Sequence, residues 1–139
     1  AGVVLGLGGP AGHVFAHCSP TARTYFDLAG IVRDVSAVTG ACMLVSRRAF
    51  EKAGGFDEAL PVAYNDIDFC IRLMRRGLRN VYTPHATLRH RESASRGSLH
   101  PVEAERYMER RWGALLEGDP FYNRNLSLRR ADPVPELRP

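Results

Sequence analysis

The most regular hydrophobic pattern in the chain lies between residues 65 and 77 and predicts an amphipathic helix. Its apolar residues recur at i, i+3, i+4 and i+7 and therefore share one face: Ile67, Cys70, Ile71 and Met74. Asn65 suits the N-cap and Gly77 suits the left-handed position that ends a helix. The polar residues of the segment are expected on the opposite side, namely Asp68, Arg72, Arg75 and Arg76.

Shorter patterns predict the remaining elements. An apolar run at 42–45, which follows a Thr39-Gly40 turn, predicts a buried strand, and residues 47–53 predict a short helix ended by Gly54. Phe56 then stands alone as an aromatic residue. Residues 81–88 look extended but interrupted by Pro84, and residues 1–20 are rich in glycine and look more like loop than regular structure. A last helix opens at Pro101, and its apolar face holds Ala104, Met108, Trp112 and Leu115.

Length and composition limit the class of protein. With 139 residues, of which 45% are hydrophobic and 24% charged, the chain has room for one globular domain. No run of 18 apolar residues is present, so a membrane-spanning helix is excluded. The three cysteines form no CxxC pair, which favours free thiols in a reducing compartment over a disulfide framework or a zinc site.

The net charge of +4 comes from one part of the chain. Residues 61–100 contain seven arginines and three acidic residues, and Lys52 is the only lysine of the chain. A nucleic-acid surface usually spreads its basic residues along a face and includes lysine. A local, arginine-only excess is at least as suitable for an anionic small molecule, because guanidinium groups bind phosphate and carboxylate bidentately. A solvated helix face explains the same excess.

Three motifs are candidate chemical sites. Asp66-Ile67-Asp68 has the spelling of a metal-binding DxD, but positions i and i+2 of a helix point about 200° apart, so the two carboxylates cannot readily hold one ion. Asp66 in the first helical turn suits either a catalytic carboxylate or a favourable helix-dipole interaction, and Asp68 suits a capping role. The run from Gly6 to Ala11 matches GxGxxA, but Pro10 is a poor helix start there, so we interpret its glycines as loop residues. His90 has no obvious pair of carboxylates near it in sequence, so most of any metal site would lie elsewhere.

Several runs in one order closely resemble family 2 glycosyltransferases. They are Thr39 to Val45, Phe50 with Gly54-Gly55-Phe56-Asp57-Glu58, Asn65 to Arg72, Val81 to Pro84, His90 to Gly97, Asp119 to Asn123 and, more loosely, the opening run to His13. Together they cover nearly the whole chain. The resemblance implies an α/β fold, namely a partial GT-A (Rossmann-like) fold. The chain would be the C-terminal half of that fold, with short strands and two to three main helices. It assigns residues 1–128 to this domain and leaves 129–139 as a loose tail containing prolines.

The resemblance also implies a reaction and a set of roles. Such enzymes transfer a sugar from a nucleotide-sugar to an acceptor hydroxyl with inversion, and the general base falls on Asp66. Substrate binding falls on Thr39, Gly40, Ala41, Asn65, Asp68 and Arg96. His90 matches a histidine that can complete a divalent-metal site, Mg²⁺ or Mn²⁺, although His90-Arg91 stands where relatives often have two histidines. The arginines are expected to help hold diphosphate, or Arg72 to pair with Asp68.

The family's nucleotide-binding half and its metal-binding DxD would precede this segment, so we expect an acceptor-side part of a longer transferase. We also expect this chain on its own to be inactive as a transferase and to self-associate. The acceptor would be a surface polysaccharide or a lipid-linked sugar. The reaction would take place in the cytoplasm or at the inner face of the membrane, and the full protein would associate peripherally with that membrane. Two other classes remain: a non-catalytic interaction module on the same scaffold, and an arginine-rich nucleic-acid-binding domain.

Overall fold

The computed structural model describes residues 2–16, 18, 24–88 and 102–135. This part of the chain contains short strands, two 3-10 turns and three α-helices, so the α/β class predicted from the sequence is confirmed. The elements in chain order are β1 (Val3–Leu5), β2 (Ala11–His13), η1 (Tyr25–Asp27), β3 (Arg33–Val35), η2 (Gly40–Cys42), α1 (Arg47–Ala53), α2 (Asn65–Met74), β4 (Asn80–Tyr82) and α3 (Val102–Leu116).

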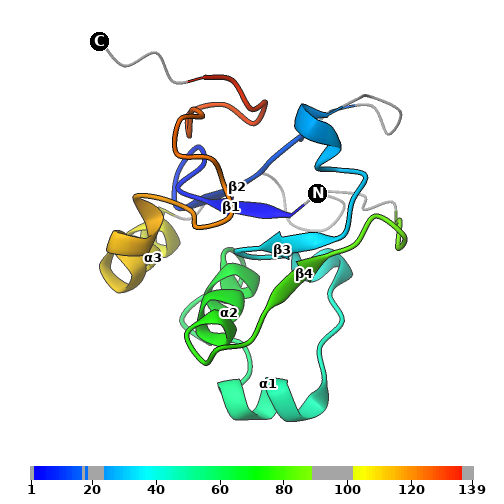
Figure 1. The fold of residues 1–139 in the computed structure, drawn as a ribbon. Coiled ribbons are helices and arrows are strands. Elements are labelled where there is room, and N and C mark those ends of the chain that lie inside the picture. The colour runs from blue at the N-terminus through cyan, green and yellow to red at the C-terminus, as the bar shows by residue number, and fades with distance from the viewer. Residues whose placement is uncertain (1, 17, 19–23, 89–101, 136–139) are drawn as a thin grey trace.

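The strands form two antiparallel pairs that are joined at one point. β1 pairs with β2 and β3 pairs with β4, and a bridge between Val3 and Ala37 connects the two pairs. Figure 1 shows β1 and β2 above β3 and β4, with α2 below them and α1 at the bottom. The sequence interpretation of residues 1–20 as mostly loop is therefore wrong for β1 and β2. Gly6 has a φ of +77°, and a β carbon there would lie 2.2 Å from the carbonyl oxygen of Leu116, so this turn requires glycine.

The main core lies where α2 and α3 meet the β1 strand. It confirms the predicted apolar face of α3 and three of the four residues predicted for that of α2, whereas Met74 lies outside this core and is only half-buried. Met108 of α3 and Ile71 of α2 are completely buried, and Trp112 and Leu115 pack against the same cluster. The buried members of this core are Val3, Leu5, Ala37, Leu60, Ile67, Cys70, Ile71, Ala104 and Met108. A helical spacing of apolar residues has thus placed both helices correctly.

The two ends of α2 are built differently from each other. The N-cap is Tyr64, with a φ of +63°, rather than the predicted Asn65. Asn65 instead accepts a hydrogen bond at its Oδ1 from the backbone N–H of Asp66, at 2.7 Å. The C-terminal end follows the prediction: Gly77 has a φ of +76°, and the N–H of Leu78 donates to the carbonyl of Leu73 at 3.1 Å. This is the hydrogen bond that closes a helix on a left-handed glycine.

Helix α1 also follows the prediction and carries an aromatic cluster. Ser46 caps its first turn by accepting from the N–H of Ala49 at 3.2 Å, and Gly54 ends it with a φ of +82°. The sequence predicted that Phe56 is isolated, and this prediction is wrong. Its ring centroid lies 5.5 Å from that of Phe50 and 5.3 Å from that of Phe69, in the edge-on arrangement that aromatic rings prefer.

The predicted buried strand at 42–45 is wrong. Residues 40–42 form η2, Met43 is extended, and Leu44 is 101% exposed before α1 begins at Arg47. No β-ladder partner for this segment occurs in the described ranges. An apolar run becomes a buried strand only when neighbouring strands cover it, and here nothing described does so.

The segments that follow α2 and α3 complete the fold. β4 ends at Tyr82, and residues 86–88 form no strand, because Pro84 interrupts the extended backbone. Near the C-terminus, the N–H of Ser127 donates to the carbonyl of Val134 at 2.8 Å and the N–H of Phe15 donates to that of Ala131 at 2.9 Å. No helix of the described residues is long and apolar enough to span a membrane.

Candidate active site

The carboxylate of Asp66 lies against the Thr39-Gly40-Ala41 turn. Its Oδ2 accepts a hydrogen bond from the N–H of Gly40 at 2.7 Å, and its Oδ1 accepts from the N–H of Ile67 at 2.9 Å. A β carbon on Gly40 would lie 3.4 Å from the β carbon of Asp66, so the turn and the side chain are in close contact. Asp66 is half-buried and Gly40 is exposed, so the carboxylate stays within reach of solvent.

Local hydrogen bonds explain why this arrangement forms. Thr39 caps η2 by accepting from the N–H of Ala41 at 3.3 Å, which turns the backbone so that the Gly40 N–H faces α2. Asn65 holds the N–H of Asp66, as described above. The structure therefore brings together five of the residues predicted for the site: Thr39, Gly40, Ala41, Asn65 and Asp66.

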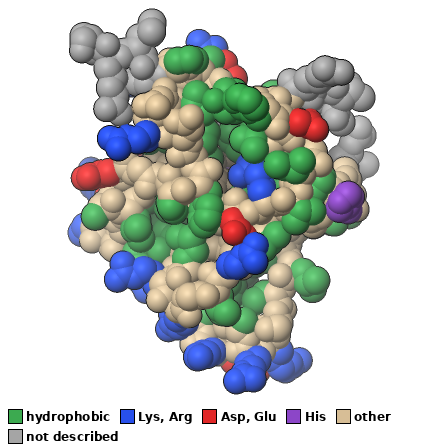
Figure 2. Space-filling model, viewed as in Figure 1, with side chains coloured by type: hydrophobic (Ala, Val, Ile, Leu, Met, Phe, Trp, Pro, Cys, Tyr) green, Lys and Arg blue, Asp and Glu red, His purple; other side chains and the backbone are tan. Residues whose placement is uncertain are grey.

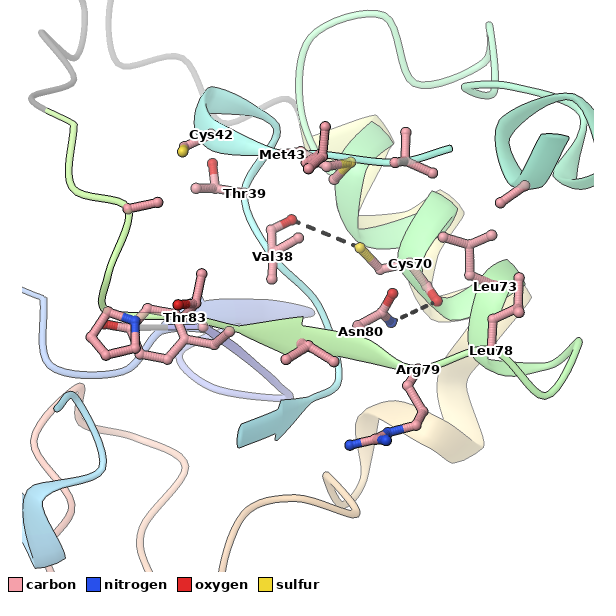
Figure 3. A pocket seen from close by; sticks show the side chains of 18 of the residues that line it. Val38, Thr39, Cys42, Met43, Cys70, Leu73, Leu78, Arg79, Asn80 and Thr83 are labelled. Atoms are coloured by element: carbon pink, nitrogen blue, oxygen red, sulfur yellow. Dashed lines mark hydrogen bonds between the residues drawn. The ribbon is translucent and has the colours of Figure 1, made fainter. Parts of the chain in front are cut away.

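A groove of about 730 Å³ borders this turn at Thr39. Its walls come from residues 38–39 and 42–46, from Cys70 and Leu73 of α2, and from β4 with the segment after it (Figure 3). Cys70 donates from its thiol to the carbonyl of Val38 at 3.8 Å, and burial raises the pKa of this thiol to about 11, so it stays protonated at neutral pH. Asn80 donates to the carbonyl of Cys70 at 3.0 Å, which ties β4 to α2 behind the groove.

Asp68 faces a different part of the molecule from Asp66. It has no exposed surface, and its Oδ2 accepts from Nε of Arg72 at 2.7 Å while its Oδ1 accepts from Nε1 of Trp112 at 2.9 Å. Nε of Arg111 lies 3.4 Å from the same Oδ1. Asp68 therefore does not lie with Asp66 at the Thr39-Gly40-Ala41 turn. This separation is expected, because residues two apart on a helix point to different sides. It does confirm the pairing of Arg72 with Asp68.

Arg72 belongs to this buried network and not to a free cationic surface. Only 8% of the residue is exposed, and its guanidinium also donates to the carbonyls of Ala53 and Gly55 at the end of α1. Arg79 pairs with Asp34, with 2.9 Å between Nε and Oδ1, and points away from Thr39 in Figure 3. The described arginines of the stretch at 61–100 are therefore divided between the interior, where Arg72 lies, and the surface, where Arg75, Arg76 and Arg79 lie.

A second carboxylate on α3's side of the network was missed by sequence reasoning. Asp57 accepts from the hydroxyl of Tyr107 at 2.7 Å and from Arg111. The hydrogen bond from Tyr107, then that from the N–H of Ala59 and the contact with Arg111, lower the pKa of Asp57. The available signal was the spacing of Tyr107 and Arg111, one helical turn apart, which places both on one face.

Two residues predicted for the site, His90 as a metal ligand and Arg96 as a substrate-binding residue, lie outside the described residues. In the described ranges, no three His, Cys, Asp or Glu side chains lie close enough together to hold a metal ion. Asp66 and Asp68 fit this result, because one faces the Gly40 turn and the other faces Trp112.

Comparisons with known proteins give relatives that are much longer than this chain. The chain is 43% identical over 140 residues to the uncharacterized protein y4gI of Sinorhizobium fredii (strain NBRC 101917 / NGR234) and 39% identical over 137 residues to the O-antigen biosynthesis protein RfbC of Myxococcus xanthus. Each match covers 95% of the chain but only 15% and 11%, respectively, of those two proteins.

A third relative matches a shorter segment. It is the N-acetylglucosaminyl-diphospho-decaprenol L-rhamnosyltransferase of Mycobacterium tuberculosis (strain CDC 1551 / Oshkosh), 40% identical over 65 residues, which are 47% of the chain and 21% of that protein. No solved structure matches the chain significantly. The family model described as glycosyltransferase like family 2 matches residues 11–114, which include the Gly40 turn, α2 and most of α3. The chain therefore belongs to glycosyltransferase family 2.

Proposed function

We propose that this chain is the acceptor-side part of an inverting glycosyltransferase and that Asp66 is its general base. The observation that carries the proposal is the placement of Asp66. Its carboxylate is half-buried at the start of α2, is held by the Gly40 N–H and adjoins the turn that borders the groove. A helix N-terminus favours the ionised form of a carboxylate, which is the form that a base needs.

The proposed step is a direct displacement. Asp66 accepts the proton of the acceptor hydroxyl while that oxygen forms a bond to the anomeric carbon of the donor sugar. The bond from this carbon to the nucleoside diphosphate breaks with its electron pair, so the leaving group departs as an anion and the configuration inverts. A base for such a transfer must approach the hydroxyl to about 3 Å. The exposed backbone of Gly40 beside Asp66 leaves that approach open.

The names of the relatives support a substrate class. RfbC is named for O-antigen biosynthesis, and the mycobacterial relative is named for rhamnosyl transfer to a diphospho-decaprenol-linked sugar. We therefore propose a nucleotide-sugar donor and a polysaccharide or lipid-linked acceptor for the longer polypeptide, acting in the cytoplasm or at the inner face of the membrane. The described residues supply no metal site, so the proposal assigns Mg²⁺ or Mn²⁺ to residues outside them, with His90 as this chain's contribution.

The test is Asp66→Asn in the longer polypeptide. Removal of a general base is expected to lower kcat by about 10²- to 10⁴-fold. Donor binding, measured by calorimetry, should remain, because asparagine keeps an acceptor oxygen for the Gly40 N–H. Asp132→Asn, which changes an exposed carboxylate paired with Arg130, is the matched control and should leave kcat unchanged. An unchanged kcat in Asp66→Asn contradicts the base assignment, and robust turnover by these 139 residues alone contradicts the expectation that they are only part of the enzyme.

A further inference from the structure

Helix α3 contacts the polypeptide on both sides of Asp66. Before Asp66 in the chain, the hydroxyl of Tyr64 donates to Oε1 of Glu105 at 3.3 Å. After it, Oδ1 of Asp68 accepts from Nε1 of Trp112 at 2.9 Å. Glu105 and Trp112 are seven residues apart, which is two helical turns, so one face of α3 makes both contacts.

Both contacts are made by groups that have little freedom to move. Asp68 has no exposed surface and is also held by Arg72, so a shift of the first turn of α2 would break buried hydrogen bonds. Tyr64 adopts a left-handed backbone with a φ of +63°, which a non-glycine residue keeps only when its surroundings hold it. Burial, and then the nearby Glu105, raise the pKa of Tyr64 to about 12, so its hydroxyl remains a donor at neutral pH.

The remaining contacts of Asp66 are local and come from the backbone. Its oxygens accept only from the N–H groups of Gly40 and Ile67 among the described residues, and neither bond alone fixes the direction in which α2 begins. The residues on either side of Asp66, Tyr64 and Asp68, are tied to α3 by side-chain hydrogen bonds. The separation of 44 positions between Asp68 and Trp112 makes this a tertiary constraint.

We propose that α3 positions Asp66 for proton transfer, with Trp112 and Glu105 as positioning residues that act through Asp68 and Tyr64. The inference rests on the proposed function of Asp66. Its chemical basis is that a catalytic group must be held close to its productive geometry, and a displacement of about 1 Å can lower a rate by about 10²-fold.

The test compares Trp112→Phe and Tyr64→Phe with a packing control in the longer polypeptide. Each of the two variants removes one hydrogen-bond donor and keeps an aromatic ring in place. Each should lower kcat by roughly tenfold to a hundredfold and leave KM for the donor within about twofold, because substrate binding does not use these donors. Met108→Leu, at a completely buried position on the same helix, is the control and should leave kcat unchanged.

The outcomes separate this inference from the proposed function. Unchanged kcat in both Trp112→Phe and Tyr64→Phe overturns the positioning role, as does a fall in kcat that Met108→Leu reproduces at the same loss of thermal stability. Asp66→Asn is measured alongside. If Asp66→Asn abolishes turnover while the two positioning variants are fully active, only the positioning role fails. If Asp66→Asn is itself fully active, the base assignment fails and the positioning role fails with it.

Discussion

Replacement of Arg72 by methionine is expected to destabilise the protein strongly, because Arg72 is the centre of a buried polar network. Its guanidinium donates to Asp68, to Ala53 and to Gly55, and only 8% of the residue is exposed. Methionine fills a similar volume but leaves Asp68 with a buried negative charge. Removal of one partner from a buried ion pair typically costs about 3–5 kcal/mol.

The lower end of that range is the expected value here. Asp68 keeps the indole N–H of Trp112, and Arg111 remains 3.4 Å from its Oδ1, so the carboxylate is not left without partners. The free energy of unfolding should therefore fall by about 3 kcal/mol, against a total of about 5–15 kcal/mol for an ordinary domain. The stability of Arg72→Lys should lie between that of the unchanged protein and that of Arg72→Met, because an ammonium keeps the charge but cannot donate to all three acceptors in the fixed geometry of a guanidinium.

Urea unfolding provides the measurement, and Trp112 provides a probe inside the network. It is the only tryptophan of the chain, so its fluorescence reports on the contact with Asp68, and far-ultraviolet circular dichroism reports on the helices. Arg75→Met changes an exposed arginine of the same region and should alter the stability by less than about 0.5 kcal/mol. If the free energies of unfolding of Arg72→Met and Arg75→Met differ by less than about 1 kcal/mol, the buried ion pair does not stabilise the protein by the expected amount.

Two further predictions concern a carboxylate and an exposed apolar residue. The folded state lowers the pKa of Asp57, so its stabilising contribution is present above the ordinary aspartate pKa of about 4 and is lost as the pH falls below it. Urea unfolding between pH 3 and 7 should thus show a flatter acid limb for Asp57→Asn, and parallel profiles would contradict this. Leu44→Ser should change the free energy of unfolding by less than about 0.5 kcal/mol, because Leu44 is fully exposed, and a loss above 1 kcal/mol would show that it packs as a strand residue after all.

Helices could be predicted from this sequence because their signals are local. The apolar spacing of α2 and α3, the serine cap of α1 and the glycines at 54 and 77 all act within a few residues. The two strand pairs could not be predicted in the same way. Each strand has three residues, too few for an alternating pattern, and β3 and β4 meet only because segments more than 40 positions apart come together.

The wrong prediction at residues 42–45 has the same origin. An apolar run reports that a segment can be buried, but burial needs a partner that the run does not specify. Here Thr39 caps the 3-10 turn η2 at one end of the run and Ser46 caps helix α1 at the other. Leu44 lies between them, and no described residue covers it.

Asp66 and Asp68 show which properties of a motif follow from helical geometry and which depend on tertiary contacts. Helical geometry alone separates the two carboxylates, which argues against a shared metal ion, and the structure shows this separation. It cannot say which of the two is available for chemistry. That depends on Trp112 and Arg111, which contact Asp68 from a helix more than 40 positions away, and on Gly40, whose N–H donates to the half-buried carboxylate of Asp66. Two identical side chains in one turn of helix are thus assigned to structure and to the candidate site by donors that lie elsewhere in the chain.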